Sequence, residues 1–200
     1  MTRAMPTLES DRLRIRPFLK IDLDPIHTIK TNIGWVNPHL SRTQQRNERE
    51  QWLHWNILNH TQFGQLAQPP YGDKAVILKE SGKLIGSVGL VPCLDAFEQL
   101  PYFGGRENCL HTTEMGLFWL IAPDEQGKGY ATEAALTLID YAFDALRLHQ
   151  IVATTEYNNH ASQAVMKKLG MIIERNPFPK PPWLQVVGVL AQEKLNKEQA

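Results

Sequence analysis

The chain has 200 residues, of which 42% are hydrophobic, and 21 basic side chains balance 21 acidic ones. A formal net charge of zero argues against a nucleic-acid-binding protein that relies on a broad basic surface, although a small local patch stays possible. This length fits one domain whose core needs neither disulfides nor a structural metal. We therefore expect a single domain over residues 1–200, with a core at about residues 7–192.

Cysteine and histidine usage gives no sign of a metal site or a disulfide scaffold. Cys93 and Cys109 are too few for a disulfide framework and are not spaced like zinc ligands. The seven histidines are scattered, and we expect them at the surface or at helix caps. No apolar run is long enough to cross a bilayer, and residues 1–16 lack the apolar core of a signal peptide. We therefore expect a cytoplasmic protein with no metal, no membrane partner and no nucleic-acid partner.

The first half of the chain contains three predicted strands and two predicted helices. Hydrophobic periodicity predicts a strand over residues 11–16 and a short helix over residues 22–31. A mostly polar segment with apolar residues on one side predicts an amphipathic helix over residues 41–60. Two apolar runs, 74–79 and 84–91, are separated by a glycine-containing turn and predict a hairpin.

The second half begins with a segment that has no clear period. Residues 92–111 predict a long loop, for which a functional role and a tolerated surface insertion both remain open. The elements expected after it are a strand, a helix, a strand, a helix and two strands, at residues 114–121, 131–146, 151–155, 159–169, 171–173 and 183–191. This order of elements predicts an α/β fold with one mixed sheet flanked by helices.

The most informative segment is a glycine-containing turn that opens the helix expected at 131–146. It reads Gln126-Gly127-Lys128-Gly129-Tyr130-Ala131. A helix N-terminus offers unpartnered N–H groups and partial positive charge, and glycine lets those groups approach a phosphate. A Walker-type ATP loop is absent, and a dinucleotide fingerprint would need a third Gly or Ala where this chain has Thr132. The diphosphate of coenzyme A is the third candidate, and a nucleotide-binding oxidoreductase stays an alternative.

Four segments in matching order resemble the GCN5-related N-acetyltransferase (GNAT) superfamily, and its RimJ/RimL-like branch in particular. Residues 126–131 match the Q/R-x-x-G-x-G/A signature, and residues 8–17, LESDRLRIRP, resemble the first strand of that branch. Residues 114–120, EMGLFWL, resemble E-I-G-Y-W-L, and residues 159–171, NHASQAVMKKLGM, resemble N-x-x-S…K-L-G-F. The resemblance implies a mostly antiparallel sheet of about seven strands, about four helices, and acetyl transfer from acetyl-CoA to a primary amine.

The resemblance also assigns residues to the coenzyme. In this superfamily the strand before the glycine turn splays from the next strand and pairs with the pantetheine arm. Main-chain contacts to pantetheine would come from Leu120, Ile121 and Ala122. The diphosphate would be held by the amides of Gln126, Gly127, Lys128, Gly129, Tyr130 and Ala131, with Thr132 nearby. Asn159 would bond the pantetheine and could cap its helix at the same time.

Two residues are candidates for catalysis. Glu114 would take the proton of the acceptor amine through water or attract its ammonium, with a plain strand-end charge as the alternative. Ser162 would point towards the thioester sulfur, because Met166 stands where many superfamily members carry a tyrosine proton donor. A backbone N–H near Ile121 would polarise the thioester oxygen. Weaker candidates for the base are His111, Glu156 and Tyr157.

The acceptor site is the part that the resemblance defines least. It places Trp35 and Asn37 in one wall, the loop 92–111 in another, and Trp183 either at the far side or in the core. The acceptor would be a protein N-terminal α-amine or a small-molecule amine, and the chain a monomer or homodimer. A non-catalytic acyl-CoA-binding sensor is the alternative that Met166 favours.

Overall fold

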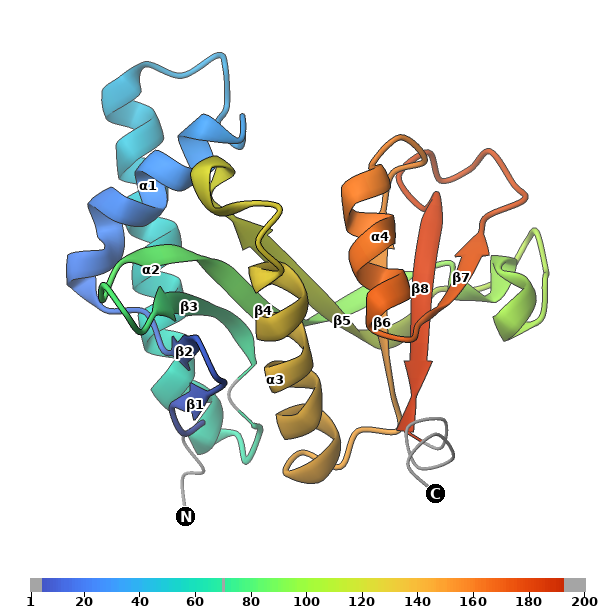
Figure 1. Cartoon of the computed structure of the whole chain (residues 1–200). Coiled ribbons are helices and arrows are strands. Elements are labelled where there is room, and N and C mark those ends of the chain that lie inside the picture. The colour runs from blue at the N-terminus through green and yellow to red at the C-terminus, as the bar shows by residue number, and fades with distance from the viewer. Residues whose placement is uncertain (1–4, 70, 193–200) are drawn as a thin grey trace. The chain divides into compact units, whose positions relative to one another are not determined.

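The computed structural model describes residues 5–69 and 71–192 (Figure 1). Within these residues it contains four α-helices and an eight-stranded sheet with the order β1-β2-β3-β4-β5-β6-β8-β7. The elements are β1 (Leu8–Glu9), β2 (Leu13–Arg16), η1 (Lys20–Asp22), α1 (Leu23–Asn32), α2 (Arg42–Gln65), β3 (Gly72–Leu78), β4 (Leu84–Asp95), η2 (Phe97–Gln99), η3 (Pro101–Phe103), β5 (Thr112–Ile121), η4 (Pro123–Glu125), α3 (Tyr130–Asp144), β6 (Gln150–Thr155), α4 (His160–Lys168), β7 (Ile172–Arg175) and β8 (Val186–Ala191). The η elements are short 3-10 helices.

The predicted fold class is confirmed. Strand pairs β1–β2, β2–β3, β6–β8 and β7–β8 are antiparallel, whereas β5 and β6 run parallel with Gly116 opposite Val152. The sheet has one strand more than expected. The extra strand is β1, whose two residues are too few to show a period in the sequence.

The segment 92–111 differs from the structureless loop that the sequence predicts. β4 continues to Asp95, and the 3-10 helices η2 and η3 follow it. Phe97 and Leu100 are fully buried in a cluster with residues of β6 and β8, among them Val152. Burial of these side chains holds the segment in place, and this packing comes from residues distant in the sequence. Helix α2 is also longer than predicted, because it continues to Gln65.

Contacts between residues divide the chain into two units. The first comprises Met1–Gly89 and Phe118–Leu138, and the second comprises Leu90–Leu117 and Ile139–Ala200. The extent of the single domain expected from the sequence stays a prediction. Within the described residues, no helix combines the length and the apolar character that crossing a membrane requires. No group of three or more His, Cys, Asp or Glu side chains in the same residues is arranged to hold a metal ion.

In the first unit, α1 and α2 pack against strands of the sheet. Phe18, Ile26 and Leu53 are almost fully buried and join Ile77 and Leu120 in one hydrophobic cluster. Burying side chains of this size contributes about 1.5–3 kcal/mol each, so this cluster dominates the packing of α1 and α2 on the strands. The cluster therefore fixes the positions of α1 and of the end of β5, which lie next to the turn between β5 and α3.

A buried lysine lies in β3. Lys74 is 1% exposed, and its Nζ donates to Tyr71 O at 3.4 Å. Burial lowers the pKa of Lys74 from its usual 10.5 to about 8, against the opposing effect of Asp73. The folded protein thus binds this proton more weakly than the unfolded chain does.

We expect Lys74→Met to flatten the pH dependence of stability. The folded-state pKa is below the unfolded value, so wild-type stability is reduced below pH 8 and recovers as the pH rises from about 8 to 10.5. The variant lacks the Lys74 contribution to this recovery, whose upper limit is roughly 3 kcal/mol, and keeps that of Lys30, whose pKa burial also lowers to about 8. Urea unfolding at pH 7.5 and 9.5 measures it. Lys20→Met, at an exposed position, is the control. Equal pH slopes in wild type and Lys74→Met would contradict the burial effect.

Candidate functional site

The glycine-containing turn predicted from the sequence lies between β5 and α3, within the first unit. β5 ends at Ile121, η4 follows it, and α3 begins at Tyr130. Gly127 and Gly129 have φ angles of 74° and 85°, a left-handed backbone that residues with a Cβ rarely adopt. The strand–turn–helix arrangement is confirmed, and its backbone explains both glycines.

The turn presents unpartnered backbone N–H groups. Gly127 and Gly129 are exposed, and their N–H groups donate to no acceptor among the residues that the structure describes. The Gln126 side chain donates from Nε2 to Ile121 O at 2.9 Å and so ties the turn to the end of β5. Unpartnered amides at a helix N-terminus are an arrangement that binds phosphate. The turn therefore fits a diphosphate group.

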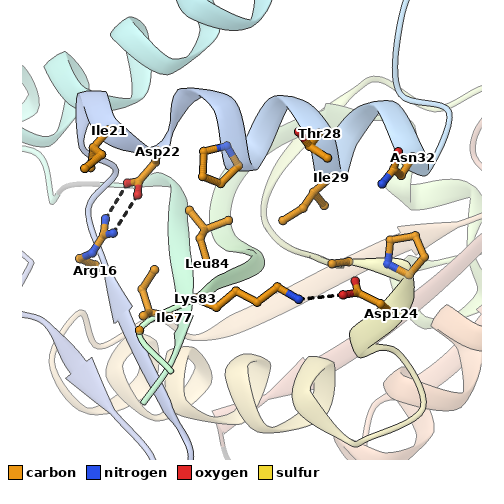
Figure 2. Close-up of a pocket in the computed structure, with 14 residues that line it drawn as sticks. Arg16, Ile21, Asp22, Thr28, Ile29, Asn32, Ile77, Lys83, Leu84 and Asp124 are labelled. Atoms are coloured by element: carbon orange, nitrogen blue, oxygen red, sulfur yellow. Dashed lines mark hydrogen bonds and ion pairs between the residues drawn. The ribbon is translucent and has the colours of Figure 1, made fainter. Parts of the chain in front are cut away.

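The charged side chains around the turn neutralise one another. Lys83 Nζ lies 2.7 Å from Asp124 Oδ2, a pair visible in Figure 2, and 2.9 Å from Glu125 Oε1. Lys128 Nζ lies 2.7 Å from Glu125 Oε2, and this hydrogen bond raises the pKa of Lys128. Lys128 is thus charged but already paired. The amides and the dipole of α3 are the groups that remain to attract an anion.

Glu133, in the first turn of α3, is held by the N-terminal segment. Ser10 Oγ and the Arg12 backbone N–H donate to Glu133 Oε1 at 2.7 and 2.9 Å. The Arg12 guanidinium lies 2.6 Å from Glu133 Oε2 and 4.5 Å from the centre of the Tyr130 ring, and it donates to Lys128 O. Burial would raise the pKa of Glu133, but the hydrogen bonds from Ser10 and Arg12 hold it below its usual value. Sequence inspection missed this contact because Arg12 and Glu133 are 121 positions apart.

The main chain at the end of β5 is partly engaged inside the protein. Ala122 N–H donates to Ile85 O at 2.8 Å, and Ala122 O accepts from Glu125 N–H at 2.9 Å. Ile121 O accepts from the Gln126 side chain. The side chains of Leu120, Ile121 and Ala122 are buried. A ligand that pairs with this strand therefore finds fewer free backbone N–H and C=O groups than the sequence suggests.

Three further residues singled out by the sequence lie in the second unit. Glu114 is half-buried in β5 and accepts a hydrogen bond from Gln150 Nε2 at 2.7 Å. Asn159 caps α4, since its Oδ1 accepts from Ser162 N–H at 3.0 Å. Ser162 is half-buried, and within the described residues its hydroxyl has no hydrogen-bond partner. The capping role of Asn159 is confirmed.

Comparison with known families gives these features a context. The sequence matches the model of the Acetyltransferase (GNAT) domain over residues 12–172. The chain belongs to the GNAT acetyltransferase family. An uncharacterized N-acetyltransferase of Bacillus subtilis (strain 168), YnaD, is 39% identical over 104 residues, which are 50% of this chain and 52% of YnaD. The chain thus matches about half the length of that relative.

Solved GNAT structures share the fold. An acetyltransferase from Agrobacterium tumefaciens str. C58 superposes with a TM-score of 0.64 at 24% identity, covering 96% of this chain and 98% of that one. RimL, described as a ribosomal L7/L12 α-N-protein acetyltransferase in complex with coenzyme A, superposes with a TM-score of 0.63 at 14% identity over 94% and 97% of the two chains. The GNAT family uses acetyl-CoA, whose diphosphate is a group of the kind that the glycine turn fits.

The position where many GNAT members carry a tyrosine belongs to the core here. Met166 is fully buried, and a Cβ on Gly188 would lie 3.2 Å from its Sδ. Tyr157 donates its hydroxyl hydrogen to Asn176 O at 2.9 Å, so that hydroxyl is engaged with the backbone. The other two weaker candidates for the base, His111 and Glu156, are exposed.

The aromatic residues assigned to the acceptor site differ in their surroundings. Trp183 is 65% exposed, and its Nε1–H donates to Asp95 Oδ2 at 3.0 Å, so the interpretation of Trp183 as a core aromatic is wrong. The two prolines directly before it, Pro181 and Pro182, prevent a regular strand that would carry it inward. Trp35 is half-exposed with its ring 5.6 Å from Phe118 of β5. Asn37 Oδ1 accepts from His39 N–H at 3.0 Å, which stabilises the turn before α2.

A cleft that the sequence did not reveal lies next to the glycine turn in the first unit. Its volume is about 730 Å³, and α1, the β3–β4 hairpin and Ala122–Asp124 line it (Figure 2). Ile29 and Leu84 form part of its apolar wall. At one end Arg16 binds Asp22 through two hydrogen bonds of 2.7 and 2.8 Å. The walls come from segments far apart in the sequence, so no local pattern signals the cleft.

We expect Glu133→Gln to destabilise the protein by about 1–2 kcal/mol at pH 7, because it removes the charge that Ser10 and Arg12 stabilise. The folded-state pKa of Glu133 is depressed, so its contribution is present above the unfolded value near 4.5 and is lost as the pH falls through the folded-state pKa. Urea titrations at pH 7 and pH 3 measure the change.

The matched control is Glu9→Gln, which removes a carboxylate that forms ion pairs with Arg14 and Lys79 but is half-exposed. Exposed ion pairs contribute little to stability. An equal loss in both variants, or a Glu133→Gln loss that persists unchanged at pH 3, would contradict the role given to Glu133.

Proposed function

We propose that the protein transfers an acetyl group from acetyl-CoA to a primary amine, directly within a ternary complex. The observation that carries this proposal is the pair of unpartnered amides at Gly127 and Gly129, at the start of α3, in a chain of an acetyltransferase family. A diphosphate bound there positions the rest of the coenzyme relative to the turn.

Coenzyme binding is assigned to two groups of residues. The diphosphate is held by main-chain groups of Gln126, Gly127, Lys128, Gly129, Tyr130 and Ala131, and Thr132 is half-buried beside them. Pantetheine is assigned to Leu120, Ile121, Ala122, Asn159 and Ser162. The Ile121 N–H is the main-chain donor best suited to pantetheine or to the thioester oxygen, since Ala122 N–H is already bonded to β4. The amide hydrogens of Asn159 are the part of that side chain left for the coenzyme, because its oxygen caps α4.

The chemistry needs a neutral amine. Its nitrogen attacks the thioester carbonyl carbon, a C–N bond forms, and the C–S bond breaks. Glu114, oriented by Gln150, takes the amine proton through water. The sulfur leaves as a thiolate, and the unpartnered hydroxyl of Ser162 donates a hydrogen bond to it. Met166 cannot donate a proton, and a thiolate is a good leaving group, so hydrogen bonding is sufficient.

For the acceptor, we propose a primary amine that reaches the protein near Trp35 and Asn37. The resemblance to the RimJ/RimL-like branch supports a protein N-terminal α-amine, and a small-molecule amine is the other candidate. An α-amine with a pKa near ~8 is far less protonated at neutral pH than an alkyl amine near ~10, so it reacts more readily. We expect the protein to act in the cytoplasm as a monomer or homodimer.

A second candidate function is a non-catalytic acyl-CoA-binding module, and the burial of Met166 favours it. Thiol release from acetyl-CoA across a panel of amines and peptides separates the two. Coenzyme binding without turnover on any acceptor would support the binding module. Turnover on any amine would establish the enzyme.

We expect Gly129→Val to raise the Kd for coenzyme A at least tenfold. The residue has φ of 85°, and a Cβ there would lie 3.4 Å from Arg12 Nη2, so valine disturbs the backbone that presents the amides. Isothermal titration with coenzyme A measures the effect. Gly170→Val is the control, because Gly170 has φ of 74° at the end of α4. An unchanged Kd in folded Gly129→Val would count against the turn as the diphosphate site.

We expect Glu114→Gln to lower kcat by about 10–100-fold with little change in the Kd for coenzyme A, because only proton transfer is impaired. Thiol release measured between pH 6 and 9 tests this. Asp144→Asn removes an exposed carboxylate in the same unit and should leave kcat unchanged. Wild-type activity in Glu114→Gln over the whole pH range would remove Glu114 from the mechanism.

A further inference from the structure

We infer that Lys30 and Arg49 form a subsite for an anionic group of the acceptor, so that the favoured substrate is a small amine bearing a carboxylate or a phosphate. This inference rests on the proposed function, because it names the substrate class of that reaction. It depends on two cations of the first unit that have no acidic partner in ion-pair contact among the described residues.

Lys30 is a buried cation in α1. Its side chain is 4% exposed, and its Nζ lies 3.4 Å from the centre of the Trp52 ring and 6.0 Å from that of Trp35. Within the described residues its ammonium makes no hydrogen bond or ion pair. Burial lowers the pKa of Lys30 to about 8, against the opposing effect of Asp73, so the ammonium is still mostly charged at pH 7. A cation–π contact alone compensates a buried ammonium poorly.

Arg49 lies on α2 near the same aromatic ring. Its guanidinium carbon is 5.6 Å from the centre of the Trp52 ring, and Nη2 donates to Trp35 O at 2.9 Å. Arg49 Nε is buried with no hydrogen-bond partner in the described part of the chain. An unsatisfied buried donor is unfavourable, and an anionic oxygen is a strong hydrogen-bond acceptor for a guanidinium N–H. Lys30 and Arg49 therefore approach one ring from two helices with unused donors.

The acidic side chains near these cations leave Lys30 and Arg49 without an ion pair. Burial lowers the pKa of His27, Arg49 and Arg46 lower it further, and Asp24 opposes them. Asp73 is the acid that acts on Lys30, and burial raises the pKa of Asp73. Asp24 is paired with Arg46, and Glu48 opposes the lowering of the Arg49 pKa by burial without forming an ion pair with Arg49. Among the described residues none of these acids forms an ion pair with Lys30 or Arg49, which favours an anionic ligand over a polyamine at these two cations.

The cations are connected to the strand that leads to the glycine turn. Arg49 holds the carbonyl of Trp35, and the Trp35 ring lies 5.6 Å from Phe118 in β5. Phe118 is two residues before Leu120, which is assigned to pantetheine. The resemblance to the GNAT superfamily also implies that Trp35 lies in the wall of the acceptor site. An anionic group bound by Lys30 and Arg49 would thus anchor the acceptor on the side of Trp35, while its amine extends towards β5.

The test compares amines that differ in the anionic group. The probes are phosphoethanolamine with ethanolamine, β-alanine with β-alaninamide, and spermidine as a polycation. The enzymes are wild type, Lys30→Met, Arg49→Met and Arg46→Met. Arg46 is exposed and already paired with Asp24 at 2.8 Å, so it is the matched control. Thiol release gives kcat and KM, and titration of phosphoethanolamine into the coenzyme A complex gives its Kd.

We expect wild type to favour the acidic member of each pair at least tenfold in kcat/KM. Lys30→Met and Arg49→Met should each raise the KM for that member about tenfold with little change in kcat, and leave the neutral member unaffected. Arg46→Met should behave as wild type. Because the two variants change different helices, a folding defect in one of them would not explain the same result in both. A Kd for coenzyme A equal to that of wild type shows that a variant is folded.

Acetylation without a preference for acidic amines, or a preference that survives both substitutions, would overturn the subsite and leave the proposed function intact. If no amine were acetylated, the proposed function would be contradicted instead. The titration then decides the subsite by itself. Phosphoethanolamine binding that weakens in Lys30→Met and Arg49→Met supports it, and binding that is absent or unchanged refutes it.

Discussion

The proposed coenzyme site depends on the hydrogen bonds and the ion pair that Ser10 and Arg12 form with the Glu133 carboxylate. A helix N-terminus binds an anion only if its first N–H groups are held in place without being used by the protein itself. Ser10 and Arg12 fix the first turn of α3 through the Glu133 carboxylate and leave the amides of Gly127 and Gly129 open. A carboxylate near a helix N-terminus also interacts favourably with the helix dipole, so the contact stabilises α3 as well.

The two groups of cations in the first unit differ in how they are paired. Around the glycine turn, Lys83 and Lys128 each bind an acidic side chain, so a ligand there meets neutralised side chains and open amides. Near Trp52, Lys30 and Arg49 have no such partner among the described residues. Main-chain donors are suited to binding a ligand group that is present in every reaction cycle, such as the diphosphate of a coenzyme. Unpaired side-chain cations suit a group that distinguishes one substrate from another.

Sequence patterns predicted the order of elements because apolar periodicity is a local property. The strand–turn–helix around Gly127 and Gly129 could be predicted for the same reason, since glycine positions and helix periodicity occur within one short segment. Properties set by tertiary packing could not be predicted. The burial of Phe97 depends on residues of β6 and β8, so the local sequence around it predicts only a loop.

Side-chain surroundings were the least predictable part of the candidate site. Trp183 looks like a core residue by type, yet it is exposed and bonds Asp95. The unpartnered state of Lys30 and of Arg49 Nε is visible only once α1, α2 and Trp35 are placed in space. From sequence alone, a polar residue in an amphipathic helix is predicted to be exposed to solvent, and only its neighbours in the folded structure can show otherwise.

The hydrogen bond from Gln126 to Ile121 O has a consequence for the kinetics of ligand capture. With Gln126 bound to β5 and Lys128 O bound to Arg12, both ends of the turn are pinned by the protein's own contacts. A preorganised loop loses little conformational entropy on association. For a coenzyme bound at this turn as proposed, we expect association to be governed by encounter and desolvation, with no slow ordering phase, and differences in affinity between ligands to arise in their dissociation rates.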